Sequence, residues 1–188
     1  MRNGVLDKTQ EKRLRILKAA RFLVLRNGLR GTTMEAIARE AQIAKPTLYA
    51  HFPDKDAIYA GIVDGLANDL LAAFALGMSG PGDVADRIGA ALAGQFSVLA
   101  QALDGSPHAS ELMSEHKRAG AKFREKDEQA FSQIAAALRE AGVAEPGDLA
   151  RLVMAAAYGI ALKTSDEAAM ADGIKLLCRR MIGGEMKA

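Results

Sequence analysis

Side chains that can bind an anion alternate with apolar ones in the short segment KPTLYAHFPDK, which runs from Lys45 to Lys55. Tyr49 and His51 carry hydroxyl and imidazole groups, which can donate hydrogen bonds to phosphate oxygens. A lysine at position 45 can also donate to the acceptors on a guanine edge, and a threonine can contact a thymine methyl group. The residue types therefore fit contacts to both the backbone and the bases of a nucleic acid.

These polar side chains need an element that holds them on one side. Leu48 and Phe52 are four residues apart, so on a helix they would lie on one face and anchor it to a core. Pro46 is tolerated in the first turn of a helix but not in its interior. The segment predicts a short helix from about Ala44 to Phe52, which Pro53 ends.

Two further helices are predicted before this segment. Apolar residues at helical spacing mark the first over residues 8–27, and Gly28 follows as its C-terminal stop. In TTMEAIAREA, Thr32 and Glu35 have the spacing of a capping box, with Thr32 as N-cap and Glu35 reaching back to it. Thr33 lies at the same helix N-terminus, where free N–H groups and the helix dipole favour a phosphate.

Three helices with a short turn between the second and third have the plan of a helix-turn-helix unit. In such a unit the second helix of the motif enters the major groove of DNA. Lys55, at the start of a fourth helix, adds a charge that suits another phosphate. The predicted DNA-contacting residues are Thr32, Thr33, Lys45, Pro46, Thr47, Tyr49, His51 and Lys55.

The charge distribution agrees with this interpretation. Residues 1–56 hold 12 Lys and Arg against 6 Asp and Glu, whereas the remainder holds 13 against 17. A basic N-terminal part suggests a polyanionic partner, and the basic tail from Arg2 to Arg15 could add contacts to the backbone or the minor groove. Two alternatives stay open: uneven surface charge without a partner, or a three-helix module that binds protein.

The segment ILKAARFLVLRNGLRGTTMEAIAREAQIAKPTLYAHFPDKDAI, Ile16 to Ile58, resembles the DNA-binding domain of the TetR (tetracycline-repressor) family of bacterial transcriptional regulators. The resemblance rests on a spaced pattern: Ala19, Ala20, Gly28, Thr32, Thr33, Ile37, Ala38, Ala41, Leu48, Tyr49, His51, Phe52 and Lys55. It implies a dimeric, all-helical repressor whose C-terminal domain binds a small molecule that releases the DNA.

Two positions depart from the pattern of that family. Gln42 stands where the family usually has the glycine of the turn, so we expect a positive φ at a cost of about 1 kcal/mol. Ala44 stands where a serine usually caps the recognition helix, which costs about 0.5–2 kcal/mol of local stability. Both departures concern the local geometry of the third helix rather than its anchors.

We predict an all-α chain of about nine helices, with a DNA-binding domain over residues 1–56 and a helical effector-binding and dimerisation domain over residues 57–188. Large side chains in the second domain are candidates to line an effector cavity: Phe74, Phe96, Leu99, Met113, Phe123, Met154 and Tyr158. Their low charge suggests an apolar or aromatic effector. The last two helices could form a four-helix dimer interface with their symmetry mates. The candidates there are Ala155, Gly159, Leu162, Ile174, Leu177 and Met181.

Other functions have little support in the sequence. It shows no pairing of a nucleophile with a base and no glycine-rich phosphate loop, so we do not expect an enzyme or a cofactor. His108, Glu111 and Glu115 share one helical face, but solvated surface residues explain them better than a metal does. The single cysteine, Cys178, excludes an internal disulfide. The N-terminus lacks the apolar core of a signal peptide, and the longest apolar run falls short of the roughly 20 residues that span a bilayer.

The sequence therefore predicts a cytoplasmic, ligand-responsive DNA-binding regulator. As the resemblance implies, it would act as a homodimeric repressor on a palindromic operator and be released by a small apolar or aromatic effector. The alternative is a helical module that binds a small molecule or a protein and retains the N-terminal domain without specific DNA binding.

Overall fold

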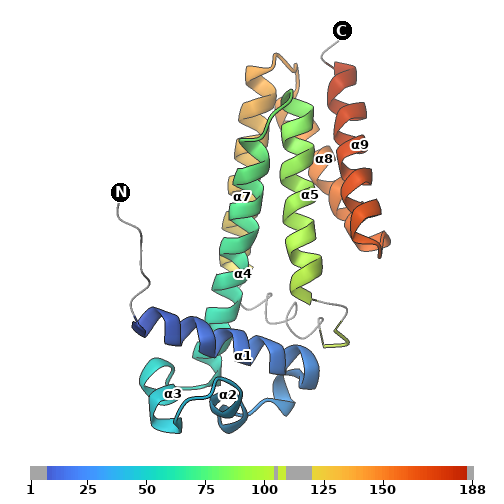
Figure 1. Cartoon of the computed structure of the whole chain (residues 1–188). Coiled ribbons are helices and arrows are strands. Elements are labelled where there is room, and N and C mark those ends of the chain that lie inside the picture. The colour runs from blue at the N-terminus through green and yellow to red at the C-terminus, as the bar shows by residue number, and fades with distance from the viewer. Residues whose placement is uncertain (1–7, 104–105, 109–119, 186–188) are drawn as a thin grey trace. The chain divides into compact units, whose positions relative to one another are not determined.

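The computed structural model describes residues 8–103, 106–108 and 120–185. Within these residues the chain forms eight helices and no strand (Figure 1). They are α1 (Lys8–Gly31), α2 (Met34–Glu40), α3 (Lys45–His51), α4 (Lys55–Met78), α5 (Val84–Leu103), α7 (Gly120–Glu140), α8 (Pro146–Lys163) and α9 (Glu167–Glu185). The predicted all-α class is confirmed, and the further helix expected shortly after Ser106 lies mostly outside the described residues.

The described residues divide into two compact units, and the boundary falls within α4. The first unit holds residues 8–65, 106–108 and 120, and in it α2 and α3 pack against one flank of α1 (Figure 1). The hydroxyl of Ser106 donates a hydrogen bond to the carbonyl oxygen of Leu25 in α1. The largest fully buried side chains of this unit are Ile16, Val24, Ile37, Leu48, Phe52 and Ile58.

The end of α1 differs from the simple stop that the sequence suggests. Gly28 has φ 73° and breaks the helical geometry, as predicted, but one more turn follows as far as Gly31. The hydroxyl of Thr32, only 1% exposed, donates to the Gly28 carbonyl oxygen at 2.8 Å. The predicted capping box is therefore wrong by one residue: Thr33 is the N-cap, and its hydroxyl accepts from the Ala36 N–H at 3.1 Å.

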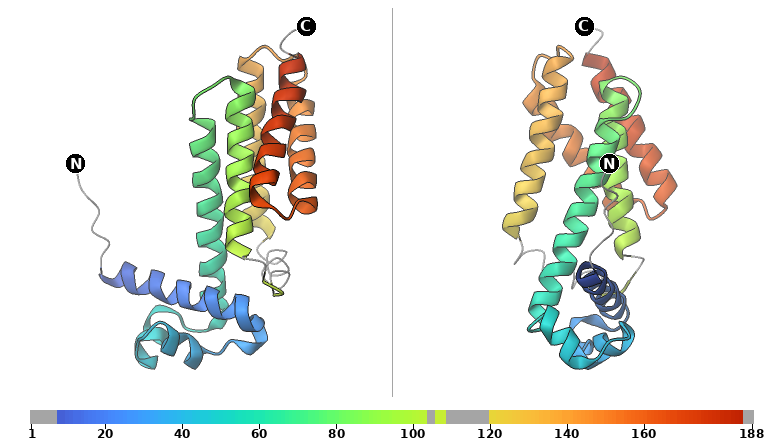
Figure 2. Two further views of the ribbon diagram at one scale, coloured as in Figure 1. Left: turned by 45° about the vertical axis from the view of Figure 1, so that its right-hand side comes forward. Right: turned by 60° about the vertical axis from the view of Figure 1, so that its left-hand side comes forward.

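The second unit holds residues 66–103 and 121–185, and α5 lies between α4 and α9 (Figure 2). Glycines allow α5 to approach both neighbours closely. A Cβ at Gly77 of α4 would lie 2.2 Å from the backbone nitrogen of Ala91. A Cβ at Gly89 of α5 would lie 3.1 Å from the Lys175 Cα of α9. The core of this unit includes Ile88, Leu92, Ile134, Leu138, Val153, Ile174, Cys178 and Ile182.

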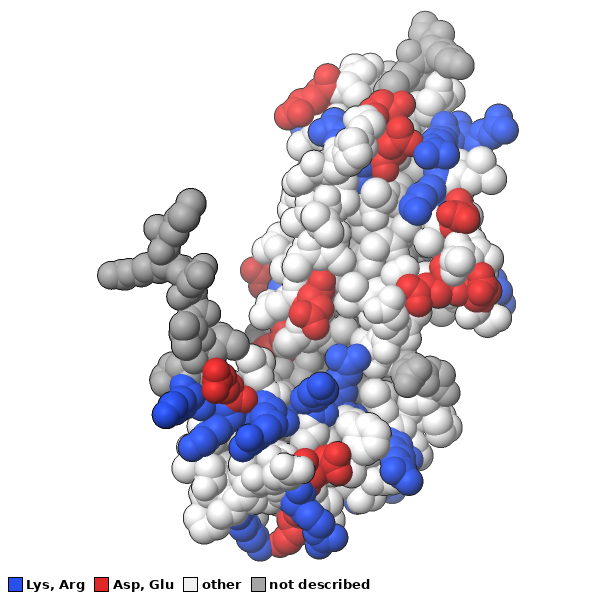
Figure 3. All heavy atoms as spheres, in the orientation of Figure 1, with Lys and Arg blue, Asp and Glu red and all other residues white. Residues whose placement is uncertain are grey.

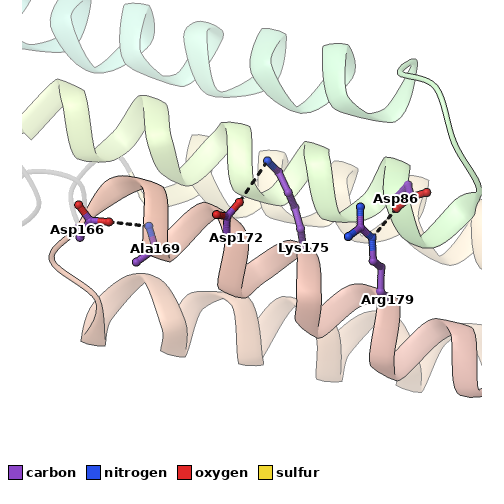
Figure 4. Close-up of polar contacts among 6 residues, drawn as sticks. All are labelled: Asp86, Asp166, Ala169, Asp172, Lys175 and Arg179. Carbon is purple, nitrogen blue, oxygen red and sulfur yellow. Dashed lines mark hydrogen bonds and ion pairs between the residues drawn. The ribbon is translucent and has the colours of Figure 1, made fainter.

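Polar contacts fix the start and one flank of α9 (Figure 4). The Asp166 carboxylate accepts from the Ala169 N–H at 2.7 Å and so caps the helix. The Arg179 Nε donates to the Asp86 carboxylate of α5 at 2.8 Å. This contact lowers the pKa of the Asp86 carboxyl and raises the pKa of the Arg179 guanidinium.

Among the described helices, α4 is long and apolar enough to cross a membrane by length and composition. Core helices of globular proteins pass the same test. The apolar residues of α4 include Ile58, Ile62 and Phe74, which are buried within the units themselves.

Candidate nucleic-acid interface

The turn between α2 and α3 sets the position of α3. Gln42 has φ 52°, which confirms the positive φ predicted at this non-glycine residue. The Ile43 N–H donates to the Ala38 carbonyl, and the Gln42 N–H donates to the Arg39 carbonyl, each at 3.0 Å. These two bonds form a Schellman motif, which satisfies the last carbonyls of α2 and reverses the chain.

Helix α3 spans Lys45–His51, within one residue at each end of the predicted range from Ala44 to Phe52, and these two residues are its caps. Ala44 makes no side-chain cap, and Pro46 lies in the first turn. Leu48 is 0% exposed and Phe52 1%, so they anchor the helix as predicted. The guanidinium of Arg13 lies 4.3 Å from the centre of the Phe52 ring, which adds a cation–π contact between α1 and the end of α3.

The polar residues of α3 remain available at its surface. Lys45, Pro46 and Tyr49 are exposed, and Thr47 and His51 are half-buried. Because Leu48 and Phe52 fill the inner face, the other side chains are left toward the outside or along its flanks. Thr33 is also exposed, at the N-terminus of α2.

Lys45 is engaged with an acidic residue that the sequence analysis assigned to another role. Its ammonium contacts the Glu35 carboxylate of α2, and both side chains are more than half exposed. The contact lowers the pKa of the Glu35 carboxyl and raises the pKa of the Lys45 ammonium. The two residues are ten positions apart in the sequence and give no local signal, because the pairing depends on how α2 and α3 pack.

Two predicted contact residues serve the fold of the domain. The Lys55 ammonium donates to the Leu29 carbonyl at 2.8 Å and to the Thr32 carbonyl at 3.2 Å. It therefore satisfies acceptors at the end of α1 instead of projecting from the surface. Thr32 is buried and its hydroxyl is occupied, so its side chain has no surface to offer to DNA.

Basic side chains gather along α1 on the face that Figure 3 shows. The exposed ones in the first half of this helix are Lys8, Lys12, Arg13, Arg15 and Lys18. Clustered positive charge on a small helical domain raises the local potential and favours a polyanion. This cluster agrees with the excess of basic residues that the sequence analysis found in this part of the chain.

The predicted effector-lining residues within the described part of the chain differ in exposure. Phe74 is buried in the core of the second unit, Phe96, Leu99 and Met154 are half-buried, and Tyr158 is 54% exposed. The rings of Phe96 and Tyr158 lie 6.3 Å apart. Met113 and the side chain of Phe123 lie outside the described residues.

A hollow of about 370 Å³ lies between α7 and α8. Of the effector-lining residues predicted within the described residues, Met154 alone lines it. The other lining residues are Arg124, Asp127, Glu128, Phe131 and Arg151. The guanidinium of Arg151 lies 5.1 Å from the centre of the Phe131 ring.

An apolar stripe runs along the exposed side of α8. It comprises Leu152, Ala155, Gly159 and Leu162, at helical spacing, and Leu176 of α9 is also exposed. Ile174, predicted at the dimer interface, is 0% exposed within the core of its own chain. Leu177 and Met181 are half-buried. Leu152 was not among the predicted interface residues, although helical periodicity places it on the face of Ala155 and Gly159.

The geometry of α2, the turn and α3 defines the N-terminal unit as a helix-turn-helix domain. Residues 16–62 match the family model of the bacterial regulatory proteins, tetR family. A stretch of 63 residues, 34% of this chain, is 36% identical to the HTH-type transcriptional regulator UidR of Escherichia coli (strain K12). That match spans 32% of the length of UidR. The match to the tetR family therefore covers the N-terminal domain.

Solved structures extend the likeness of fold to the whole chain. Salmonella enterica GusR superposes with a TM-score of 0.68 at 24% identity, covering 98% of this chain and all of that one. A TetR-like transcriptional regulator from Rhodococcus sp. RHA1 superposes with a TM-score of 0.70 at 19% identity, covering 95% of this chain and 99% of that one. The second unit therefore shares its fold with these regulators.

Proposed function

We propose that the protein is a transcriptional regulator that binds DNA through α3. The observation that carries this proposal is the arrangement of α3 itself. Leu48 and Phe52 anchor the helix, while Lys45, Thr47 and Tyr49 are left toward the outside at a length that the major groove admits. The basic residues of α1 support it by supplying an attractive field.

The side chains divide into two kinds of contact. Tyr49, His51 and the N-terminus of α2 at Thr33 suit phosphate oxygens, which fix the orientation of the protein. Lys45 and Thr47 suit base edges, and Pro46 beside them offers an apolar contact. Lys55 and Thr32 act as positioning residues, because their polar groups are bonded to the backbone at the end of α1.

The regulator would act as a homodimer on a palindromic operator. Two copies of α3 must lie about 34–36 Å apart, or a multiple of that distance, to enter successive major grooves on one side of the duplex. The exposed stripe of Leu152, Ala155, Gly159 and Leu162 offers a self-complementary apolar surface for a two-fold interface. Leu176 of α9 would extend it.

The second unit would bind a small effector that changes the affinity for DNA. The hollow between α7 and α8 is lined by the apolar side chains of Phe131 and Met154 and by charged residues. It fits an effector with an aromatic or other apolar body. If the effector's affinity differs by a few kcal/mol between two spacings of the DNA-binding domains in the dimer, its binding would be enough to release the DNA. Repression in the cytoplasm, relieved by this effector, is the simplest form of the mechanism.

Binding of the purified protein to a pool of random duplex DNA at two salt concentrations tests the proposal. We expect one palindrome to be enriched and its affinity to fall with salt by about 0.9 decades per decade for each phosphate contact. Substitution of Tyr49 should weaken binding to all sequences, whereas substitution of Thr47 should change which sequence is preferred. A dimeric protein that enriches no sequence would favour the alternative, a helical module that binds only a small molecule or a protein.

A further inference from the structure

The contact between Glu35 and Lys45 joins the first turns of the two helices that make the motif. Glu35 lies in the first turn of α2, and Lys45 is the first residue of α3. Both side chains are more than half exposed. Ion pairs with this exposure add little to stability, so stability does not account for a carboxylate beside a surface that would meet DNA.

The electrostatics keep both partners charged. The Lys45 ammonium lowers the pKa of the Glu35 carboxyl, and the carboxylate raises the pKa of the ammonium. At neutral pH the first turn of α3 therefore presents a donor and an acceptor side by side. This differs from the single positive charge that a free lysine would present.

We propose that Glu35 is a specificity-determining residue and that the Glu35–Lys45 pair reads one guanine–cytosine base pair in the major groove. The inference rests on the proposed DNA-binding function. In this arrangement the Lys45 ammonium donates to guanine O6 and N7, and the Glu35 carboxylate accepts from the cytosine N4 amino group.

The spacing of the groups on the base pair suits this arrangement. Guanine O6 and cytosine N4 are joined by a Watson–Crick hydrogen bond, so they lie about 2.9 Å apart. The second N4 hydrogen points into the major groove. A lysine and a glutamate already in contact can therefore meet the two atoms together, with the positive group on the acceptor and the negative group on the donor.

The same pair fits an adenine–thymine base pair less well. There the donor is adenine N6 and the acceptor is thymine O4. The carboxylate would lie beside adenine N7, which is itself an acceptor, and the ammonium would lie beside the thymine methyl group. Guanine instead offers Lys45 two adjacent acceptors, and cytosine places no acceptor beside the carboxylate.

The carboxylate also weakens binding at other sequences. A negative side chain brought close to DNA is repelled by phosphates unless a donor satisfies it. It also holds Lys45, which would otherwise bind any phosphate as a point charge. Glu35 should therefore lower non-specific affinity while it favours one base pair in each half-site.

Glu35→Gln tests this proposal, because it removes the charge and keeps the size. Glu40→Gln is the matched control, since Glu40 is exposed at the other end of α2 and the change in charge is the same. Each full-length variant is bound to the random duplex pool and to a fixed duplex that lacks the enriched site. Circular dichroism and sedimentation confirm that each variant is folded and has the wild-type assembly.

We expect Glu35→Gln to reduce the preference for guanine–cytosine at one position of the half-site by about fivefold or more. Its affinity for the fixed duplex should rise, with a salt dependence steeper by about 0.9 as Lys45 gains a phosphate contact. Glu40→Gln should keep the wild-type base preferences.

Unchanged base preferences in Glu35→Gln, or an equal loss in Glu40→Gln, would overturn the inference while the proposed function stands. If the wild-type protein itself enriches no sequence, the proposed function fails and the inference fails with it. The wild-type experiment therefore separates the two failures.

Discussion

Lys55 provides the sharpest test of how the N-terminal domain is built. Its ammonium donates two hydrogen bonds to the carbonyls of Leu29 and Thr32, at 2.8 and 3.2 Å. Methionine at this position keeps the length of the side chain but can donate to neither carbonyl. Lys55→Met should therefore destabilise the domain without removing a contact to DNA.

The magnitude follows from the two bonds. A hydrogen bond that involves a charged group contributes about 1.5–3 kcal/mol when buried. Lys55 is half-buried, so water can replace part of each bond in the variant. We expect a loss of about 2–3 kcal/mol in the free energy of unfolding. Arginine should restore part of it, because it retains a positive charge and N–H donors.

Urea unfolding followed by circular dichroism measures this loss, with Lys18→Met as the control. Lys18 is an exposed lysine of α1, so its replacement should change the free energy of unfolding by less than about 0.5 kcal/mol. The salt dependence of DNA binding supplies the decisive readout. Unchanged stability in Lys55→Met, together with a salt slope reduced by about 0.9, would refute the positioning role and make Lys55 a phosphate ligand.

Three further predictions concern the turn, the dimer and the buried thiol. Gln42→Gly should raise the free energy of unfolding by about 1 kcal/mol, because glycine adopts the observed φ of 52° without strain; a lower urea midpoint would contradict this. Leu162→Glu, at a side chain 64% exposed on α8, should shift the sedimentation of the protein to that of a monomer and abolish binding to a palindrome, but not helicity. A dimer that survives this charge would place the interface elsewhere. Burial raises the pKa of the Cys178 thiol from 9.0 to about 11, so the stability that the neutral thiol contributes is fully present below pH 9 and is lost as pH rises toward 11. Between pH 8 and pH 10.5 the free energy of unfolding of the wild type should therefore fall by about 2 kcal/mol relative to that of Cys178→Ala. If urea unfolding gives the same difference between the two proteins over this whole range, the thiol is not buried as described.

Local chemistry made much of the N-terminal domain predictable. Pro46, Leu48 and Phe52 determine where α3 begins and which side of it is buried, and the structure has these bounds to within one residue. The positive φ at Gln42 is expected from the resemblance to the tetR family, which usually has a glycine at this position of the turn. Each of these features depends on residues within a few positions of one another.

In other places local rules allow two answers. Thr32 and Thr33 are both good helix caps, and the deciding contact is the bond from Thr32 back to Gly28. Ile174 and Leu177 both belong to apolar rows of α9, and packing against α5 decides which row turns inward. Helical periodicity identifies both rows but does not rank them.

The contacts between separate elements could not be predicted from the sequence. Glu35 and Lys45 meet because the Schellman turn places the start of α3 near the start of α2. Lys55 reaches the carbonyls of Leu29 and Thr32 because the first turn of α4 packs at the end of α1. Residue type alone would predict that each of these lysines binds a phosphate, and each contact gives the lysine a different role.

The two lysines show how one residue type takes different roles in a single small domain. Lys55 is half-buried and its donors satisfy backbone carbonyls, so its charge supports the scaffold. Lys45 is exposed and paired with the Glu35 carboxylate, so its position is fixed and its charge is partly neutralised. The free positive charge for non-specific attraction then comes from the exposed residues of α1. In a regulator built in this way, substitutions of the exposed basic residues of α1 should change the attraction to DNA alone, whereas Glu35→Gln should change the base preference as well.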